Sequence, residues 1–231
     1  MYYCKQAEIC NIGLNKMNAV GIVTRIEELE KKRCKVYIDG EYAFILYKGE
    51  LTEYKIRENY PIEEKIYHII KKEVLPKRAK KRCLNLLQKR PYTERKLREK
   101  LEEGCYTEEI IDEAISYVKS FHYIDDYEYA CQYIFYHKES ETRKKMEEKL
   151  MIKGIDRDTL QKAFSDSYAD AEEEVMLELE QAKKLLQKKK YDPENADWKE
   201  KQKIYAFLLR KGITVSAIKR AMDLHNVGLD E

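Results

Sequence analysis

The chain has few residues that interrupt regular structure, only 8 Gly and 4 Pro in 231 residues. The glycines are dispersed, and neither G-x-x-x-x-G-K-[ST] nor G-x-G-x-x-G occurs. The usual loops that cradle nucleotide phosphates are therefore excluded. No apolar run approaches the roughly 20 residues that a membrane-spanning helix needs, and the first residues lack the apolar core of a signal peptide. These absences favour a cytoplasmic protein of long, charged helices without a membrane segment.

Metal-binding and catalytic patterns are also missing. The 6 Cys contain no C-x-x-C pair and have no nearby histidine partner, so we expect reduced thiols and no zinc site. The nearest thing to an acid–base group is His122, beside Asp125 and Asp126. An aspartate at that place is better suited to begin the next helix, by accepting its free backbone N–H groups. We therefore expect no enzyme, no metal and no cofactor.

The first 60 residues are the part with strand signals. Residues 1–17 show no periodicity, and we expect a disordered lead or a misassigned start codon. In residues 18–60, "VGIVTRIEE" and "CKVYIDGEYAFILY" are β-branched or alternate in polarity. Asp39-Gly40 supplies the positive φ angles of a two-residue hairpin turn. This pattern predicts a small N-terminal unit with a three-stranded antiparallel sheet over residues 20–47, which needs a helix to lean on.

Helical periodicity takes over beyond the sheet. Residues 62–74 are predicted to be helical, Pro76 to begin or kink a second helix that runs to about Arg90, and Pro91 to end it. No convincing strand follows. Linker helix and first repeat are expected at 61–124, with further repeats at 125–168 and 169–231.

The prediction of helical repeats depends on an internal repeat in the sequence. "KLREKLEEGCYTEEIIDEAI", from Lys96, aligns without gaps with "KMEEKLMIKGIDRDTLQKAF", 49 residues on, and with "KIYAFLLRKGITVSAIKRAM", a further 58 residues on. Apolar positions, the helix break, the N-cap and a small residue stay in register. The aligned sets are Leu97, Met146 and Ile204; Leu101, Leu150 and Leu208; Cys105, Gly154 and Gly212; Thr107, Asp156 and Thr214; Ile111, Leu160 and Ile218; Ala114, Ala163 and Ala221.

One further amphipathic helix precedes each aligned pair, near 77–90, 126–138 and 169–190. The sequence therefore predicts a mainly α fold of three tandem three-helix repeats. Upstream, Thr93 aligns with Thr142 as a helix start, while the third copy has Glu200. The third copy also has Phe207 where the others have lysine.

Charge is segregated along the chain, although the net charge is only +2. Residues 71–100 hold thirteen Lys and Arg against three Glu, whereas 101–137 hold nine Asp and Glu against Lys119 alone. Such blocks are most often solvated helix surface, but they can also orient a chain on a charged partner. The candidate partner-binding residues are Lys77, Arg78, Lys80, Lys81, Arg82, Arg90, Lys96, Arg98, Lys100, Lys145 and Lys149.

The stretches "VLPKRAKKRCLNLLQKRPYTERKLREKL", "YTEEIIDEAISYVKSFHYIDDYEYA" and "KKMEEKLMIKGI" resemble the RecX family, bacterial regulators of the RecA recombinase, over roughly residues 18–224. The resemblance implies an elongated, curved array of three-helix repeats. It further implies a monomeric protein of DNA repair, recombination and the SOS response. That protein would bind the RecA–DNA filament and modulate, most often inhibit, its recombinase, ATPase and coprotease activities.

Within that reading, contact with DNA is expected to be weak, non-specific and mainly inside the filament. The competing interpretation is a free-standing nucleic-acid-binding helical module, because three-helix units can resemble helix-turn-helix domains. It explains the basic block from Lys71 but not the long acidic stretches. A plain helical scaffold for another protein is a third possibility.

Overall fold

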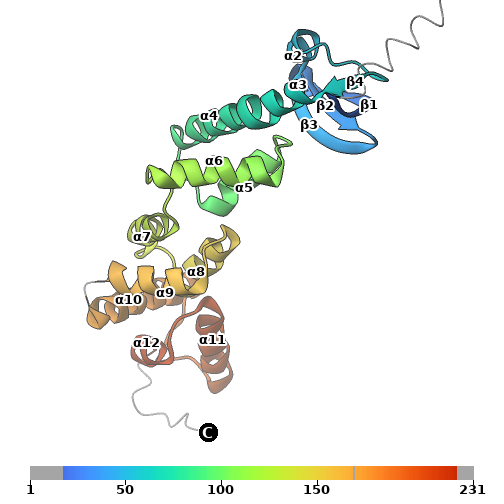
Figure 1. Cartoon of the computed structure of the whole chain (residues 1–231). Coiled ribbons are helices and arrows are strands. Elements are labelled where there is room, and N and C mark those ends of the chain that lie inside the picture. Colours follow the sequence, from blue (N-terminus) through green and yellow to red (C-terminus); the bar gives the residue numbers. More distant parts are fainter. Residues whose placement is uncertain (1–17, 169, 223–231) are drawn as a thin grey trace, which may run out of the picture. The chain divides into compact units, whose positions relative to one another are not determined.

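The computed structural model describes residues 18–168 and 170–222, drawn in Figure 1. They form two compact units, one running to Pro91 and including Leu97–Tyr123, the other formed by Tyr92–Lys96 and the chain from Ile124 on. The predicted lead at 1–17 lies outside the described residues. The division into segments at 18–60, 61–124, 125–168 and 169–231 stays a prediction.

The N-terminal sheet has four antiparallel strands, in the order β3-β2-β1-β4. Asp39 (φ 50°) and Gly40 (φ 90°) connect β2 to β3 and confirm the predicted hairpin turn. The prediction of three strands was wrong, because β4 pairs Ile62 with Gly21 of β1. A three-residue strand that opens with a proline is too short to show alternation. The elements of this unit are β1 (Ala19–Leu29), the 3-10 turn η2 (Glu30–Lys32), β2 (Arg33–Ile38), β3 (Glu41–Tyr47), α2 (Lys48–Glu53) and β4 (Pro61–Glu63).

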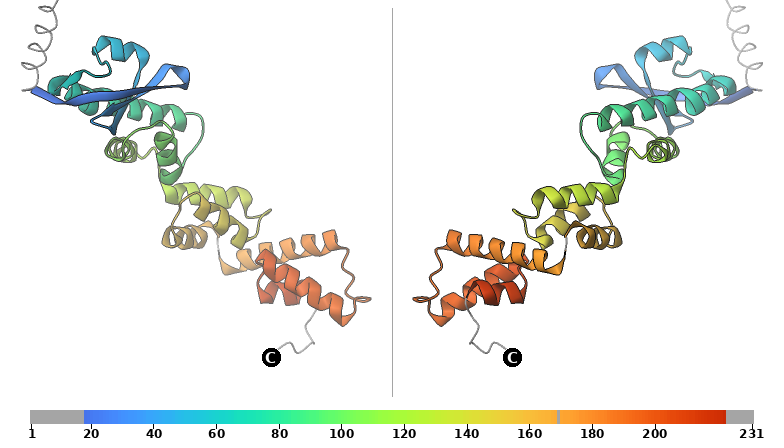
Figure 2. Two further views of the ribbon diagram at one scale, coloured as in Figure 1. Left: turned by 90° about the vertical axis from the view of Figure 1, so that its right-hand side faces the viewer. Right: turned by 90° about the vertical axis from the view of Figure 1, so that its left-hand side faces the viewer.

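The sheet packs against helix α3 (Glu64–Ile69), because so small a sheet is not stable by itself. Alternate residues of β2 are buried, and Phe44 of β3 packs against Tyr67 of α3, with ring centroids 6.0 Å apart. Figure 2 shows this sheet with the helices that follow it. A small sheet needs a packed apolar face to be stable, and α3 covers part of that face here.

Helical structure continues without a break from α3 into α4 (Leu75–Leu87), through a π-helical segment, η3 (Ile70–Val74). Pro76 lies in the first turn of α4. Proline has no N–H to donate to the preceding turn, and a wider π turn just before it accommodates that loss. The proline therefore marks a change of helix type rather than a new start.

The helices after α4 follow the repeat. Those of the first copy are α4, α5 (Glu94–Glu102) and α6 (Glu108–Ser120), and those of the second are α7 (Asp126–His137), α8 (Arg143–Ile152) and α9 (Arg157–Ser167). Those of the third are α10 (Ala171–Lys189), α11 (Trp198–Lys211) and α12 (Val215–Ala221). Leu101, Leu150 and Leu208 are each fully buried, which confirms the register of the predicted apolar face.

The break between the second and third helices also repeats. Cys105, Gly154 and Gly212 all have positive φ, at 60°, 96° and 85°. Asp156 and Thr214 then cap the next helix through their side-chain oxygens, as predicted. Thr107 begins its helix without a side-chain hydrogen bond, and its hydroxyl is buried without a partner among the described residues.

Two further contacts join successive copies, and each occurs twice at aligned positions. Thr93 donates its hydroxyl hydrogen bond to the carbonyl of Lys153 (2.6 Å), and Thr142 donates to that of Lys211 (2.7 Å). Next to these contacts, a Cβ added at Gly154 would lie 2.4 Å from the Cβ of Arg95. At Gly212 the same test meets the Cβ of Lys144, also at 2.4 Å. The glycine thus allows close approach as well as a positive φ.

Among the described residues no repeat precedes the first copy, and the N-terminal sheet contacts the break between its second and third helices instead. The hydroxyl of Tyr42 in β3 donates a hydrogen bond to the carbonyl of Cys105, at the break of that copy. Burial raises the pKa of Tyr42, so the hydroxyl remains a donor throughout the pH range of interest. The sheet therefore covers the end of the first repeat, as terminal caps do in repeat proteins.

Candidate partner-binding surfaces

Helix α4 presents Lys77 and Lys81 to solvent, four residues apart and so on one side of the helix. Its other side is in the core, where Leu75, Ala79 and Cys83 are buried. Within the part of the chain that the structure describes, neither lysine forms an ion pair. Among the described residues, these two lysines of α4 are therefore exposed and not neutralised by an ion pair.

Arg78, between those lysines, has an internal role. It pairs with Glu50 of α2, donates to the carbonyl of Ile45 (3.4 Å) and lies over the ring of Tyr47, 4.8 Å from its centroid. Its side chain is only 19% exposed. Arg78 holds α4 against the end of β3, so the structure engages this candidate inside its own unit.

Other candidates of the basic block are also engaged by neighbouring helices. Lys80 pairs with Glu113 of α6 (2.8 Å) and lies near the ring of Tyr117, and Arg82 donates to the carbonyl of Lys100 (3.1 Å). Arg90 is exposed just beyond α4, and Lys96 is half-buried in α5. The basic block thus does not form one uniform stripe.

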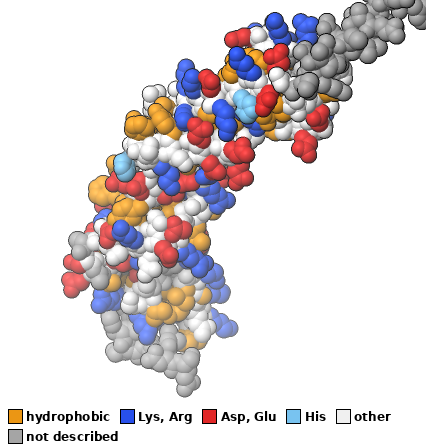
Figure 3. Space-filling model, viewed as in Figure 1, with side chains coloured by type: hydrophobic (Ala, Val, Ile, Leu, Met, Phe, Trp, Pro, Cys, Tyr) orange, Lys and Arg blue, Asp and Glu red, His pale blue; other side chains and the backbone are white. Residues whose placement is uncertain are grey.

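Acidic partners from the following block neutralise more of the candidates. Arg98 pairs with Asp112 (2.6 Å), and Lys100 pairs with Glu103 (2.7 Å). On the face shown in Figure 3, blue and red side chains are interspersed over these helices. Some basic residues of the block at 71–100 therefore form ion pairs with acidic residues of the block at 101–137 when the chain folds.

In the second copy, Lys145 and Lys149 converge on the carboxylate of Glu141, at 3.4 Å and 2.5 Å. Burial alone raises the pKa of Glu141, but the hydrogen bond from Lys149 and the charge of Lys145 hold it below its ordinary value. The equivalent of Lys149 in the third copy is Phe207, which packs against the core of that copy. The basic position is thus not shared by all three repeats.

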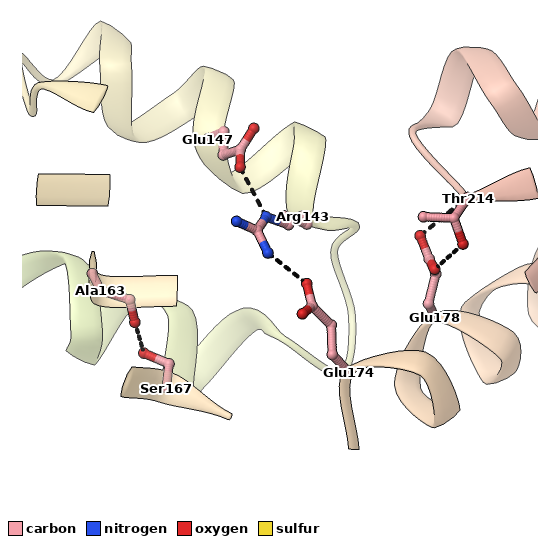
Figure 4. Close-up of polar contacts among 7 residues, drawn as sticks. All are labelled: Arg143, Glu147, Ala163, Ser167, Glu174, Glu178 and Thr214. Carbon is pink, nitrogen blue, oxygen red and sulfur yellow. Dashed lines mark hydrogen bonds and ion pairs between the residues drawn. The ribbon is translucent and has the colours of Figure 1, made fainter. Parts of the chain in front are cut away.

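Helix α10 makes polar contacts with α8 of the second copy and with the N-cap residue of α12 in its own copy (Figure 4). The guanidinium of Arg143 contacts Glu147 on its own helix (2.9 Å) and Glu174 of α10 (2.8 Å). Glu178 of α10 accepts hydrogen bonds from the backbone N–H and the hydroxyl of Thr214. The register of the repeats does not predict these contacts, because Glu174 and Glu178 lie in α10, outside the stretches that align between the copies.

The suspected catalytic turn is a structural element. Asp125 accepts hydrogen bonds from the backbone N–H groups of Tyr127 and Glu128 and so caps α7. His122 is exposed in the turn before it, with a positive φ of 55°. Among the described residues, no group of His, Cys, Asp and Glu has an arrangement that could hold a metal ion. Nor does any described helix combine the length and the apolar character needed to cross a membrane.

The fold defines a class of protein, a helical-repeat protein with a β cap at its first copy. Residues 79–117 match the first three-helix domain of RecX, and residues 177–222 match its third. A regulatory protein RecX of Clostridium perfringens is 31% identical over 196 residues, which are 84% of this chain and 91% of the relative. That of Caldanaerobacter subterraneus is 28% identical, over 88% and 99% of the two chains. The chain belongs to the RecX family of regulatory proteins.

Solved structures agree on the fold. A crystal structure of regulatory protein RecX matches with a TM-score of 0.60 at 23% identity, covering 88% of this chain and all of the other. RecX from Lactobacillus salivarius matches with a TM-score of 0.56 at 22% identity, covering 65% and 96%. At this level of identity the structures establish the fold alone.

Proposed function

We propose that this protein binds the RecA–DNA filament and inhibits its recombinase, ATPase and coprotease activities, acting in the cytoplasm as a monomeric, non-catalytic regulator of DNA repair, recombination and the SOS response. Membership of a family of regulatory proteins supports a regulatory role. The exposure of Lys77 and Lys81 on one side of α4 is the single observation on which the proposed binding surface rests.

The repeat suits a filament as partner. A filament presents the same protomer at regular intervals, and three related copies in one chain offer more than one point of contact. Linked weak contacts gain by effective concentration, so no single contact needs to be strong. Contacts that bridge adjacent protomers oppose the movements that accompany ATP turnover. Any contact with DNA is weak, non-specific and made mainly within the filament.

The two exposed lysines act at long range as well as in contact. Uncompensated surface charge steers association and affects its rate more than its final strength. The candidates that already form ion pairs or hydrogen bonds in this chain would have to exchange those partners. We therefore place Lys77 and Lys81 at the partner surface, ahead of Arg78, Lys80, Arg82, Arg98 and Lys100.

The test is the ATPase activity of RecA on single-stranded DNA, measured with increasing amounts of purified protein. We expect inhibition below one protein per RecA protomer. The double variant K77E/K81E should need about tenfold more protein, because two charge reversals remove roughly 1–2 kcal/mol of attraction. The matched control R57E/K65E reverses two exposed charges elsewhere in the same unit and should inhibit normally.

Two outcomes contradict the proposal at different levels. An unchanged ATPase at saturating protein overturns the inhibitory function itself. Inhibition that is equal in both double variants keeps the function and removes Lys77 and Lys81 from the surface. Equal affinity for naked and RecA-coated DNA would instead favour the free-standing nucleic-acid-binding module, which the same exposed lysines could serve by contacting phosphates.

A further inference from the structure

A basic groove lies in the second unit, where the start of α8 meets α10 and the end of α11. Its volume is about 630 Å³. Six basic side chains of three helices line it: Lys144, Lys145, Lys184, Lys188, Arg210 and Lys211. All six are exposed. They come from three separate helices between residues 144 and 211, so the groove is made by the fold and cannot be predicted from any one basic run of the sequence.

The acidic side chains of the groove leave most of this charge uncompensated. Three glutamates, Glu139, Glu141 and Glu148, also line it. Glu141 is already bound by Lys145 and by Lys149, which lies outside the groove. Six positive charges against three negative ones in a concave site attract an anionic ligand more strongly than the same charges on a convex surface.

Comparison with the first copy indicates which anionic group suits the start of α8. In the first copy, the backbone N–H of Glu94 at the start of α5 donates to the carboxylate of Asp126 (2.8 Å). The aligned residue at the start of α8 is Arg143. Among the described residues no carboxylate accepts from its backbone N–H, because Glu174 of α10 binds its guanidinium instead (2.8 Å; Figure 4).

Thr142 does not supply the missing acceptor. Its hydroxyl donates to the carbonyl of Lys211 and accepts no hydrogen bond from the start of α8. The aligned Thr93, by contrast, accepts one from the backbone N–H of Lys96 (3.3 Å). The free N–H groups of a helix start favour a negative charge. Thr142, Lys144 and Lys145 all line the groove, so this open helix start lies at its wall.

We propose that the groove binds an acidic peptide segment of a partner protein, with one carboxylate at the start of α8 and others on the lysines of α10 and the basic residues that end α11. A carboxylate fills the equivalent place in the first copy, which favours a peptide over a phosphate chain. Leu185 adds an apolar contact for a side chain, and Glu139 and Glu148 would repel a continuous run of phosphates.

The groove has room for an extended segment. A second hollow of about 380 Å³ shares Arg210 and is lined further by Lys199, Gln202, Lys203 and Ala206. It carries no acidic residue. A segment that leaves the groove past Arg210 therefore meets more positive charge along α11. The inference goes beyond the proposed function, because it stands on residues of the second and third copies and holds whichever protein carries the segment.

The test measures binding of the full chain to a fluorescent peptide of alternating Asp and Glu, with the corresponding Asn/Gln peptide as an uncharged control. The variant K184E/K188E reverses two exposed charges of the groove on α10. The matched variant R157E/K162E reverses two exposed charges on α9 of the same unit, outside the groove. We expect the acidic peptide to bind, and K184E/K188E to weaken binding at least about tenfold while R157E/K162E changes it less than about twofold.

Three results would overturn the proposal. These are no binding of the acidic peptide, equal weakening in both variants, and equal binding of the Asn/Gln peptide. A single-stranded oligonucleotide of the same charge provides the remaining comparison. If it binds more tightly than the peptide and is lost in K184E/K188E, the groove is a phosphate site and the peptide assignment is wrong. Circular dichroism of each variant confirms that the helices are retained.

Discussion

The hydroxyl of Thr93 donates a 2.6 Å hydrogen bond to the backbone carbonyl of Lys153, so that the start of one repeat's second helix holds the end of the next repeat's second helix. Thr142 makes the same contact with Lys211 one copy further on. Glu200 stands at this position in the third copy. The threonine is thus a feature of junctions between copies, and at Thr93 the same hydroxyl also accepts a hydrogen bond from the backbone N–H of Lys96 (3.3 Å).

Thr93 is 1% exposed, and this burial makes its hydrogen bond testable. Replacing it with valine keeps the shape but leaves the carbonyl of Lys153 without that donor. We expect Thr93→Val to lower the free energy of unfolding by about 1–3 kcal/mol. Thr93→Ser keeps the hydroxyl and should lose much less of the stability. Urea denaturation measures both, and equal losses would contradict a role for the hydrogen bond.

The break residues allow a prediction of opposite sign within one set of aligned positions. Gly154 has a φ of 96°, and an added Cβ would lie 2.4 Å from the Cβ of Arg95. We expect Gly154→Ala to cost about 1–2 kcal/mol or more, because alanine disfavours positive φ and the neighbour must shift. Cys105 has a φ of 60° although it is not glycine. We expect Cys105→Gly to raise stability by up to about 1 kcal/mol, since it removes that strain. Thermal unfolding of the two variants checks both signs.

Much of the helical fold could be predicted from the sequence, because the apolar helix faces and the breaks between helices recur at fixed spacing. The buried Leu101, Leu150 and Leu208 and the caps Asp156 and Thr214 follow from local pattern alone. The contacts between copies could not, since they depend on how helices meet. For the same reason only the folded chain shows which candidate site residues have an acidic partner: the sequence shows a basic block but not that Glu50 lies beside Arg78.

The paired carboxylate of Glu141 predicts a dependence of stability on pH. Burial raises its pKa, but the hydrogen bond from Lys149 and the charge of Lys145 lower it below the ordinary 4.5. A carboxyl group whose pKa is depressed on folding stabilises the native state above its unfolded pKa, and this contribution is lost as the pH falls through the folded pKa. Stability should therefore decrease below about pH 4.5.

Glu141→Gln is the variant that isolates this group. It should be less stable than the parent at pH 7, and the difference should shrink as the pH falls below 4.5, the ordinary pKa of the carboxyl. The exposed neighbour Glu139→Gln serves as the control and should follow the parent at both pH values. Guanidinium denaturation at pH 7 and at about pH 3.5 provides the comparison, below the ordinary carboxyl pKa. A constant difference between Glu141→Gln and the parent would show that the carboxylate is not stabilised by its two lysines.

Tyr42 tests the contact between the sheet and the first repeat. Its hydroxyl donates to the carbonyl of Cys105, and the side chain is partly buried. We expect Tyr42→Phe to lower stability by about 0.5–1.5 kcal/mol, as for the loss of one hydrogen bond. Hydrogen exchange should become faster at the amides around Cys105 and remain unchanged in α7–α9. Faster exchange throughout the chain would show a global loss of stability rather than the loss of a local cap.

Substitutions of Arg78 and Lys77, which are neighbours in α4, should affect different properties, one the stability of the fold and the other the binding of the partner. Arg78 contacts Glu50, Ile45 and Tyr47, so we expect Arg78→Ala to cost about 1–3 kcal/mol, because it leaves a half-buried carboxylate without its partner. Lys77→Ala removes an exposed side chain and should change stability by less than about 0.5 kcal/mol. In the RecA ATPase assay the expected order reverses, with Lys77→Ala weakening inhibition and Arg78→Ala acting only through the fraction of folded protein. If folded Arg78→Ala loses inhibition while Lys77→Ala retains it, the guanidinium rather than the exposed lysine contacts the partner.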